Sequence, residues 1–275
     1  MPASIPSKIY KFQSFESEYS IENLKNSEVW FSKPKGLNDP FDCDILVNFI
    51  DTDNKEKMLE FFEKYYFKNL RKSGKEKVEV EEEISTFKRQ HFPNGKPDQK
   101  ASAVAKELFQ EFSQKQKESY ANMGVGCFTT ELANILMWSH YANGHRGFCL
   151  EFDTELFLSS ARIPDKNLMK VIYSDSYPML SPTDWYESPR RLLEPLYTKS
   201  KDWISEQEWR LLKKNGNKSF RYNPNALTAI YFGCWATKEN IAKITSLPMT
   251  PAPRFYKMQR SEKEFKLEYL PHHLS

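Results

Sequence analysis

The feature that most constrains the fold is a change in sequence character at two points along the chain. Between about residues 53 and 122, charged residues are frequent and apolar residues recur at helical spacing, which predicts three helices. On both sides of this block, short runs with strand-like alternation are separated by turn residues. The pattern predicts a single α+β domain over residues 1–275, in which residues 53–122 form a helical insertion or cap on a β-rich frame.

The predicted insertion contains apolar faces of its own. Its second helix is expected over residues 76–90, and the turn Pro93-Asn94-Gly95 separates this helix from the third. The first helix carries Met58, Phe61, Phe62, Tyr65, Tyr66 and Phe67, and the third carries Val104, Leu108, Phe109 and Phe112. Aromatic stripes at helical spacing indicate packing into a core rather than a ligand-binding box. We expect the charged faces of these helices to be solvated.

The frame around the insertion is predicted to consist mainly of short strands. They are residues 9–12, 28–32, 125–129, 147–152, 168–173, 229–233, 254–258 and 265–269. Short helices are expected over residues 20–26, 134–142 and 237–244. Asn143-Gly144 suits a left-handed cap at the end of the second of these helices.

The most informative motif for function is a pair of glutamates between two tryptophans. Glu206 and Glu208 are two residues apart, with Trp203 before them and Trp209 after them. On a strand they would point to the same face, roughly 7 Å apart, whereas on a helix they would diverge. Two such carboxylates suit chemistry on a positively charged sugar centre, one stabilising the charge and one handling the nucleophile. The alternative is a helix on which Glu206 and Arg210 form a surface ion pair.

Composition argues against several classes of protein. Only 9 glycines are present, and neither the GxGxxG nor the GxxxxGKS/T pattern occurs, which argues against Rossmann and P-loop nucleotide chemistry. The formal net charge of +3 is too small to indicate nucleic-acid binding by itself. No apolar run suits a signal peptide or a membrane span, so we expect a cytoplasmic protein without a membrane partner.

The cysteines and histidines do not predict a metal site. The four cysteines, at positions 43, 127, 149 and 234, have no CxxC spacing and are expected to be ordinary buried thiols. His140, His145 and Cys149 fall short of the four ligands at recognisable spacing that a structural metal site needs.

Several blocks of the sequence resemble one bacterial family. They are Tyr10-Lys11-Phe12, Trp30-Phe31-Ser32-Lys33-Pro34, Asn38-Asp39-Pro40-Phe41-Asp42, Leu136-Met137-Trp138-Ser139-His140-Tyr141-Ala142, the stretch 145–153, Glu206-Gln207-Glu208-Trp209-Arg210 and Ile230-Tyr231-Phe232-Gly233. In these blocks the chain resembles the bacterial domain-of-unknown-function 2971 family. The resemblance covers most of the chain outside the charged block, and it names no activity.

The order of the elements resembles a second group, the ADP-ribosyltransferase-type folds. This resemblance implies a pair of small, mostly antiparallel sheets that carry three motifs. Tyr10 or Lys11 falls in the first motif, Ser32 in the second, and Glu206-x-Glu208 in the third. Lys11 departs from the usual arginine or histidine of the first motif, because it offers a point charge instead of a planar donor fork.

The same resemblance implies NAD as the ligand. The nicotinamide would lie against an aromatic ring, for which Trp30, Phe31 and Trp209 are the candidates. Glu208 would bind the nicotinamide-ribose hydroxyl and stabilise the developing positive charge, and Glu206 would orient the acceptor. The acceptor is expected to be a macromolecule, either protein or nucleic acid, and the protein a toxin or phage-defence effector.

For four other residues the sequence allows either a structural or a functional role. His140 is either a core histidine or a catalytic group that titrates near neutral pH and reaches the carboxylate pair. Arg210 either contacts the ligand or braces Glu206 or an aspartate. Asp39 and Asp42 are either turn residues or direct participants in the site.

Two further functions therefore remain open beside the transferase. A metal-dependent nuclease would use Asp39, Asp42, Glu206 and Glu208 to hold Mg²⁺. A non-catalytic binding or sensor module would pair Glu206 and Glu208 with Arg or Lys and would lack an open pocket.

Overall fold

The chain divides into two compact units. The structure, a computed structural model, describes residues 4–43, 60–159, 168–178 and 189–272. Unit 1 consists of residues 1–42, 122–175 and 199–275, and unit 2 of residues 43–121 and 176–198. The expectation of one domain with an insertion over 53–122 stays a prediction, and its first residues, Met58 among them, lie outside the described part.

Unit 1 is built on an eight-stranded sheet with the order β12-β11-β10-β4-β1-β3-β8-β5. Its strands are β1 (Lys8–Gln13), β3 (Gly124–Thr129), β4 (Phe148–Asp153), β5 (Leu168–Lys170), β8 (Glu208–Lys213), β10 (Leu227–Phe232), β11 (Arg254–Arg260) and β12 (Leu267–Pro271). Neighbouring strands are antiparallel except for the pair of β10 and β11. Among the described residues, two further sheets have two strands each: β2 (Glu28–Phe31) with β9 (Lys218–Arg221), and β6 (Ile172–Ser174) with β7 (Thr198–Ser200).

This arrangement corrects the expected pair of small sheets. The strands were predicted as short alternating segments, and most of them are present and antiparallel. All of them except β2 and β6 join into one large mixed sheet, because β1, from the N-terminal segment, lies between β3 and β4 and hydrogen-bonds to both. Pairing between segments more than a hundred residues apart leaves no local signal in the sequence, whereas the alternation of each strand does.

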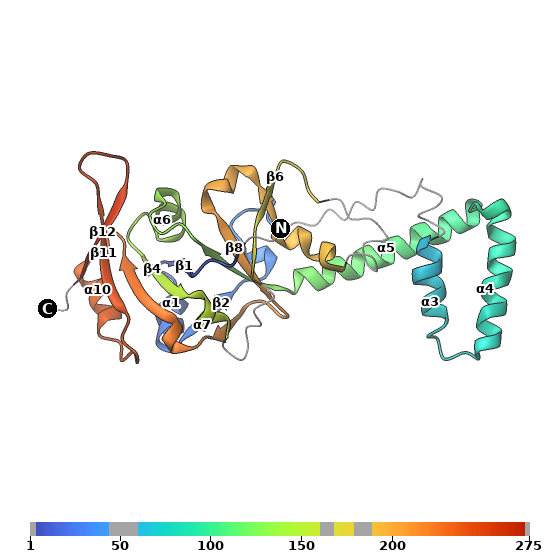
Figure 1. Cartoon of the computed structure of the whole chain (residues 1–275), viewed down its shortest axis with the longest axis horizontal. Helices are drawn as coiled ribbons and strands as arrows, with labels where there is room; N and C mark the ends of the chain where they lie inside the picture. Colours follow the sequence, from blue (N-terminus) through green and yellow to red (C-terminus); the bar gives the residue numbers. More distant parts are fainter. Residues whose placement is uncertain (1–3, 44–59, 160–167, 179–188, 273–275) are drawn as a thin grey trace. The chain divides into compact units, whose positions relative to one another are not determined.

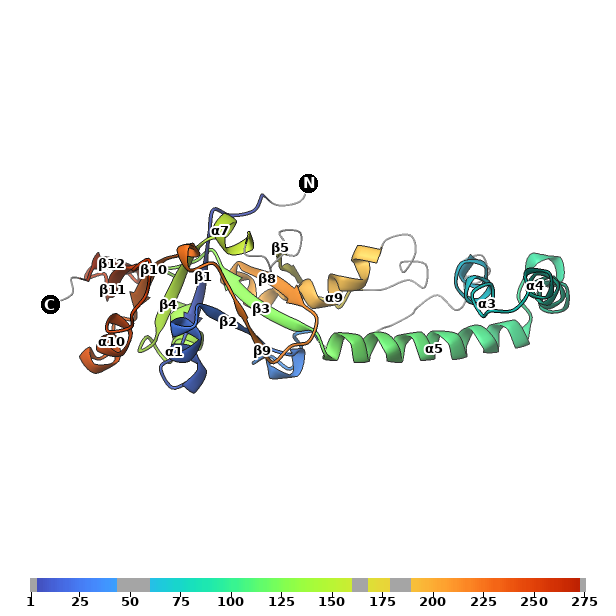
Figure 2. The same cartoon turned by 90° about the horizontal axis from the view of Figure 1, so that it is seen from below.

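Apolar residues alternate between the two faces of this sheet. In β4, Phe148 and Leu150 belong to a core on one face, whereas Cys149 belongs to a second core on the other. The first core also receives side chains from the helices α1 (Glu18–Lys25), α7 (Thr154–Leu158) and α10 (Lys238–Thr245). Figure 2 shows α1 and α10 on the same side of the sheet. The second core is covered by α6 (Ile135–Tyr141), beside β4 and β1 in Figure 1.

Three 3-10 helices complete the described elements of unit 1. They are η1 (Pro34–Gly36), η6 (Lys201–Glu206) and η7 (Pro224–Ala226). The first and the second follow β2 and β7, and both lead into the candidate site described below.

Unit 2 is largely helical and has an aromatic core of its own. Its elements are η2 (Phe62–Tyr66, a π-helix), α3 (Phe67–Leu70), α4 (Lys77–His91), η3 (Pro93–Gly95), α5 (Gln99–Ala121), η5 (Pro189–Leu193) and α9 (Glu194–Tyr197). Phe61, Phe62 and Phe67 are buried and pack with residues of α4 and α5, which confirms that this described part of the aromatic stripe is core. Figure 2 shows α5 as one continuous helix. No helix in the described ranges is long and apolar enough to cross a membrane.

Candidate functional site

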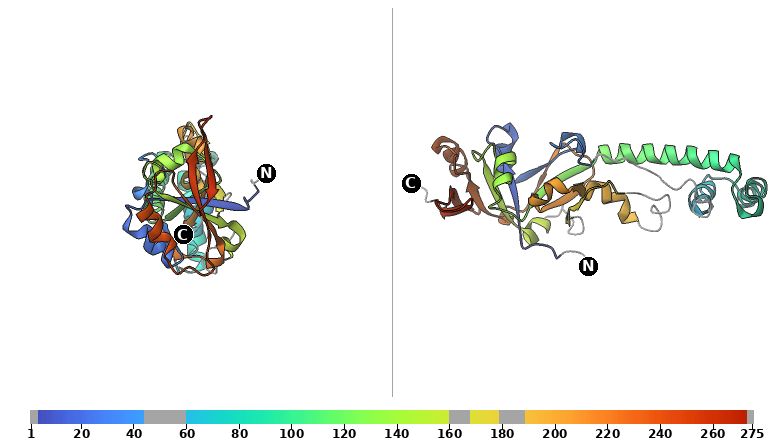
Figure 3. Two further views of the ribbon diagram at one scale, coloured as in Figure 1. Left: turned by 90° about the vertical axis from the view of Figure 1, so that its left-hand side faces the viewer. Right: turned by 90° about the horizontal axis from the view of Figure 1, so that it is seen from above.

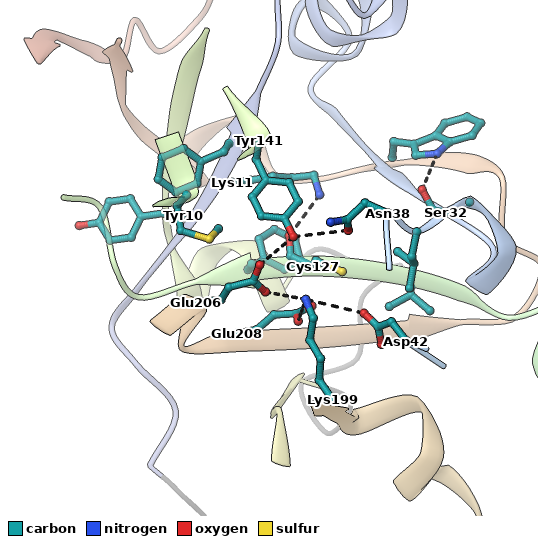
Figure 4. A pocket seen from close by; sticks show the side chains of 17 residues that line it. Tyr10, Lys11, Ser32, Asn38, Asp42, Cys127, Tyr141, Lys199, Glu206 and Glu208 are labelled. Atoms are coloured by element: carbon teal, nitrogen blue, oxygen red, sulfur yellow. Dashed lines mark hydrogen bonds and ion pairs between the residues drawn. The ribbon is translucent and has the colours of Figure 1, made fainter. Parts of the chain in front are cut away.

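A cavity of about 260 Å³ opens in unit 1 and is lined by segments that are far apart in the sequence. Its walls come from β1, β2, β3, α6, the segment after β2 and the segment 199–208 (Figure 4). Of the residues expected to form the site, Tyr10, Lys11, Trp30, Ser32, Glu206 and Glu208 line it. The cavity therefore brings together residues from strands and loops that lie far apart along the chain.

The two glutamates converge, although only one of them lies on a strand. Glu206 is the last residue of η6, and Glu208 is the first residue of β8. Gln207 between them has a left-handed backbone, with φ 45° and ψ 48°. This conformation turns the chain sharply, so both side chains reach the same point. Both carboxylates thus line one cavity, although the expectation that one strand carries both of them is wrong for Glu206. The helical alternative is also wrong, because residues 208–213 form a strand.

The point of convergence is the ammonium group of Lys199. Its Nζ atom lies 2.6 Å from Glu206 Oε2, 3.4 Å from Glu208 Oε2 and 3.7 Å from Asp42 Oδ2. The same ammonium lies 4.8 Å from the ring centroid of Trp203, within reach of a cation–π interaction. Lys199 thus neutralises a group of carboxylates that would otherwise repel one another.

A second cation, Arg210, completes the ion network from β8. Its Nε donates to Glu208 Oε1 at 2.8 Å and its Nη2 to Glu208 Oε2 at 2.9 Å, a bidentate pair. The same Nη2 donates to Asp42 Oδ2 at 2.6 Å. Arg210 is fully buried, and its partners are nearly so. Residues two apart on a strand share a face, so Arg210 pairs with Glu208 and Trp209 points the other way.

The surroundings give the two glutamates different acidities. Burial opposes the charge of Glu208, but the adjacent Arg210 outweighs it and lowers the pKa of Glu208 to about 2. Burial raises the pKa of Glu206, and its contacts with Lys199 and Tyr141 offset this only in part. Burial also works against the charge of Lys199, yet the two glutamates raise the pKa of its ammonium. Glu208 is therefore held ionised, whereas Glu206 takes up a proton more readily than an ordinary glutamate.

Helix α6 supplies a tyrosine to the less acidic glutamate. Tyr141, the last residue of α6, donates its hydroxyl to Glu206 Oε1 at 2.7 Å. The first turn of the helix is capped by the side chain of Asn134, which accepts from the backbone N–H groups of Leu136 and Met137. The amide of Asn134 also donates to the carbonyl of Ser205 at 2.5 Å. Both ends of α6 are thus tied to the segment that carries Glu206.

The N-terminal strand contributes Tyr10 and Lys11. Tyr10 donates its hydroxyl to Glu151 Oε2 at 3.2 Å, and Lys11 donates to the carbonyl of Cys127 at 3.2 Å. Burial lowers the pKa of Lys11. The thiol of Cys127 stays protonated because burial and the nearby Glu208 raise its pKa well above the ordinary value.

The segment after β2 contributes Trp30 and Ser32. Trp30 Nε1 donates to Ser32 Oγ at 3.1 Å, and the ring of Trp30 stacks on that of Tyr19 with centroids 5.9 Å apart. An isolated bridge pairs Ser32 with Val125 of β3 and so holds this segment against the main sheet. A half-buried aromatic ring and a hydroxyl thus lie on the same wall of the cavity.

Four of the expected site residues do not line the cavity. Phe31 and Trp209 are buried in the core on the other face of the sheet, since each alternates with a residue that faces the cavity. Arg210 braces Glu208 and Asp42 from below the surface. His140 is exposed on α6, and its ring packs edge-on against Trp203 with centroids 5.9 Å apart, so the expectation of a core histidine is wrong.

Lys199 and Tyr141 received no role from the sequence. Lys199, in β7, precedes Glu206 by seven residues across the 3-10 helix η6, and no periodicity in the sequence connects the two. The usable signal was physical: two adjacent carboxylates that enter a protein interior require a cation nearby. The two aspartates have different roles. Asp42 joins the ion network, whereas Asp39 accepts from the backbone N–H of Phe41 in a turn.

The nuclease alternative expects the acidic residues of the site to surround a bound metal ion. Asp42, Glu206 and Glu208 do converge, but the cations between them are the side chains of Lys199 and Arg210. In the described part of the chain, no group of three or more His, Cys, Asp or Glu residues is arranged to hold a metal ion. The four cysteines are free thiols, two of them buried and two partly exposed.

Comparison with known families gives one match. Residues 137–211 match the sequence model of a family described as protein of unknown function, DUF2971. The matched stretch contains Tyr141, Lys199, Glu206, Glu208 and Arg210, and so most of the ion network. It supports the resemblance to that family over this stretch. No curated protein and no solved structure matches the chain.

Proposed function

We propose that the chain is an ADP-ribosyltransferase-like enzyme that uses NAD to modify a macromolecular acceptor. The observation that carries this proposal is the convergence of Lys11, Ser32 and the pair Glu206 and Glu208 in one cavity. The resemblance in element order assigns these residues to three motifs of one site. They come from three segments that nothing in the local sequence connects.

The size of the cavity and its lining suit one end of the dinucleotide. A volume of about 260 Å³ lies just below the range typical of whole-ligand pockets, so the cavity suits the nicotinamide-ribose end and leaves the adenosine end outside. Trp30 offers an aromatic face for the nicotinamide ring. The carboxylates of Glu206 and Glu208 offer acceptors for ribose hydroxyls.

The different acidities of the glutamates suit two different roles. Transfer breaks the bond between the nicotinamide nitrogen and the ribose carbon, and nicotinamide leaves with the electron pair. Glu208, held ionised by Arg210, stabilises the positive charge that develops on the ribose. The acceptor nucleophile forms the new bond to the same carbon, and Glu206, whose pKa is raised, receives its proton.

One observation favours a second candidate, a non-catalytic binding module. That alternative expects Glu206 and Glu208 to be paired with Lys or Arg, and both are. It also expects the pair to lack an open pocket, whereas both glutamates line the cavity. The paired glutamates thus fit this candidate and the open cavity does not. A binding module at this site would therefore hold its ligand in the cavity and use the ion network only to keep the walls in place.

Turnover of labelled NAD tests the proposal. Purified wild type, Glu206→Gln and Glu208→Gln are incubated with adenine-labelled NAD and a cell lysate, and released nicotinamide and labelled macromolecule are measured. Loss of the base in Glu206→Gln is expected to slow transfer about 10²- to 10⁴-fold. Loss of charge stabilisation in Glu208→Gln is expected to slow it about 10²- to 10³-fold.

The control is Glu155→Gln, which changes an exposed glutamate on α7 outside the cavity and should retain full activity. Circular dichroism and melting temperature confirm that each variant is folded. A melting temperature that NAD raises, without nicotinamide release, would establish the binding module instead. If no nicotinamide is released and NAD does not raise the melting temperature, NAD is neither the substrate of a transferase nor the ligand of a binding module here.

A further inference from the structure

A second and larger cavity lies in unit 1 beside the β11–β12 hairpin. It has a volume of about 1110 Å³ and is bounded by this hairpin, by the start of α6 and by residues 234–235. The hairpin lies at the end of the eight-stranded sheet, where Figure 3 shows it (right view, dark red). Ile135 of α6 lines this cavity, whereas Met137 and Tyr141 of the same helix line the candidate site. We call the larger cavity the hairpin groove.

Cations outnumber anions along the hairpin groove. Lys257, Arg260, Lys263 and Lys266 line it, against Glu262 and Glu264. Lys257 donates to the carbonyls of Gly233 and Ala236, so its charge is used within the protein. Arg260, Lys263 and Lys266 are exposed at and beyond the end of β11. Three exposed cations against the two exposed glutamates leave the groove a small excess of positive charge for an anionic partner.

Large aromatic side chains stand exposed in the same groove. The exposed fraction of Trp235 is 51%, and Phe265 at the tip of the hairpin is fully exposed. The guanidinium of Arg146 lies 5.3 Å from the ring centroid of Trp235, within reach of a cation–π interaction. His145 also lines the groove, and its Nδ1 is a buried atom without a hydrogen-bond partner among the described residues. The rings of Trp235 and Phe265 therefore offer an exposed aromatic surface on which a planar ligand group could stack.

We propose that the hairpin groove binds single-stranded nucleic acid. Proteins that hold single strands combine aromatic side chains, on which unpaired bases stack, with a positively charged groove that follows the backbone. Trp235 and Phe265 supply the rings, and Arg260, Lys263 and Lys266 the charges for phosphates. A paired duplex would leave these rings uncovered, because its bases are already stacked on one another.

This inference deepens the proposed function and rests on it in one respect. The bound strand is the macromolecular acceptor of the transferase, because α6 forms part of both the groove and the candidate site. Binding of the strand requires neither NAD nor the glutamates. The two proposals therefore fail separately.

Fluorescence anisotropy with labelled 20-nucleotide oligo-dT and oligo-U, at rising NaCl, tests the binding step with the full chain. Wild type is expected to bind with an affinity that falls as salt rises. The double variant Lys263→Ala, Lys266→Ala should lower the slope of log affinity against log salt by about 1.4, at about 0.7 for each phosphate contact on a single strand. Trp235→Ala should weaken binding roughly 5- to 100-fold through lost stacking.

The matched control is Lys170→Ala, Lys214→Ala, which removes two exposed lysines outside both cavities and should leave affinity and slope unchanged. Glu206→Gln should bind like wild type even where it transfers nothing. Absence of binding in 50 mM NaCl, or binding that Lys263→Ala, Lys266→Ala and Trp235→Ala all leave unchanged, would overturn the inference. So would equal displacement of the oligonucleotide by poly-glutamate or by phosphatidylserine vesicles.

Discussion

Arg210 is the side chain on which the charge balance of the candidate site depends. Its buried guanidinium holds both oxygens of Glu208 and one of Asp42. In Arg210→Met the two carboxylates lose this partner, and loss of one member of a buried ion network typically costs about 3–5 kcal/mol. We expect urea unfolding at pH 7 to show a loss of this size. Arg221→Met is the control, because Arg221 pairs with Glu28 at the surface and should cost at most about 1 kcal/mol.

The pH dependence of the stability lost in Arg210→Met shows whether the loss comes from charge or from packing. Because folding lowers the pKa of Glu208 to about 2, its ionisation stabilises the fold above its ordinary value of 4.5. That stability is lost as pH falls from about 4.5 toward 2. The raised pKa of Glu206 acts with the opposite sign. Without Arg210 the pKa of Glu208 rises, so the difference between wild type and Arg210→Met should shrink between pH 5 and pH 3. A difference that stays constant over this range would mean that packing, rather than charge, was lost.

Among the elements, the packing of β2 against the main sheet depends on Gly126 in β3. A Cβ atom at this position in β3 would lie 2.6 Å from Cε1 and 2.8 Å from Cζ of Phe31. Glycine therefore lets the ring of Phe31 lie against β3, which places its neighbours Trp30 and Ser32 at the cavity. Gly126→Ala should destabilise the protein by about 1–3 kcal/mol, as expected for overpacking, measured by urea unfolding.

Two variants make this test specific. Gly36→Ala should change stability by no more than about 0.5 kcal/mol, because the nearest atom to its Cβ is 3.7 Å away. Shortening the ring side chain in Phe31→Leu, Gly126→Ala should cost less than the sum of the two single changes. Strict additivity would contradict the role of the Phe31–Gly126 contact.

The elements also show which parts of the site could be predicted from the sequence. Alternation located most strands, and the motif around Glu206 and Glu208 located the carboxylates, because both signals are local. The order of strands in the sheet could not be predicted, because β1 pairs with segments more than a hundred residues away. Nor could the left-handed backbone of Gln207, since glutamine has no local preference for it. The need for a nearby cation could be predicted, but not that Lys199 would supply it, because Lys199 meets the carboxylates only in the folded chain.

At the scale of the whole molecule, each unit has its own hydrophobic core. The two cores of unit 1 lie on the faces of the eight-stranded sheet, whereas the core of unit 2 is the aromatic cluster around Phe62 and Phe67. Cores that share no residues can unfold as separate cooperative transitions. We therefore expect two transitions in urea rather than one.

Two spectroscopic probes distinguish the units. Five of the six tryptophans lie in unit 1, so their fluorescence reports mainly on the sheet. The two longest helices in the described part of the chain, α4 with 15 residues and α5 with 23, lie in unit 2 and are expected to dominate the circular dichroism at 222 nm. The two signals should change at different urea concentrations. Coincident curves would show that the chain unfolds as the one domain that its sequence predicts.

Matched core variants identify which transition belongs to which unit. Phe67→Ala removes a fully buried ring from unit 2 and should cost about 3–5 kcal/mol there. It should move the circular-dichroism midpoint and leave the fluorescence midpoint in place. Arg210→Met should do the reverse, because Arg210 lies in unit 1. If either variant moved both midpoints equally, the two units would unfold as one cooperative structure, and loss of the ion network would then destabilise the helices of unit 2 as well.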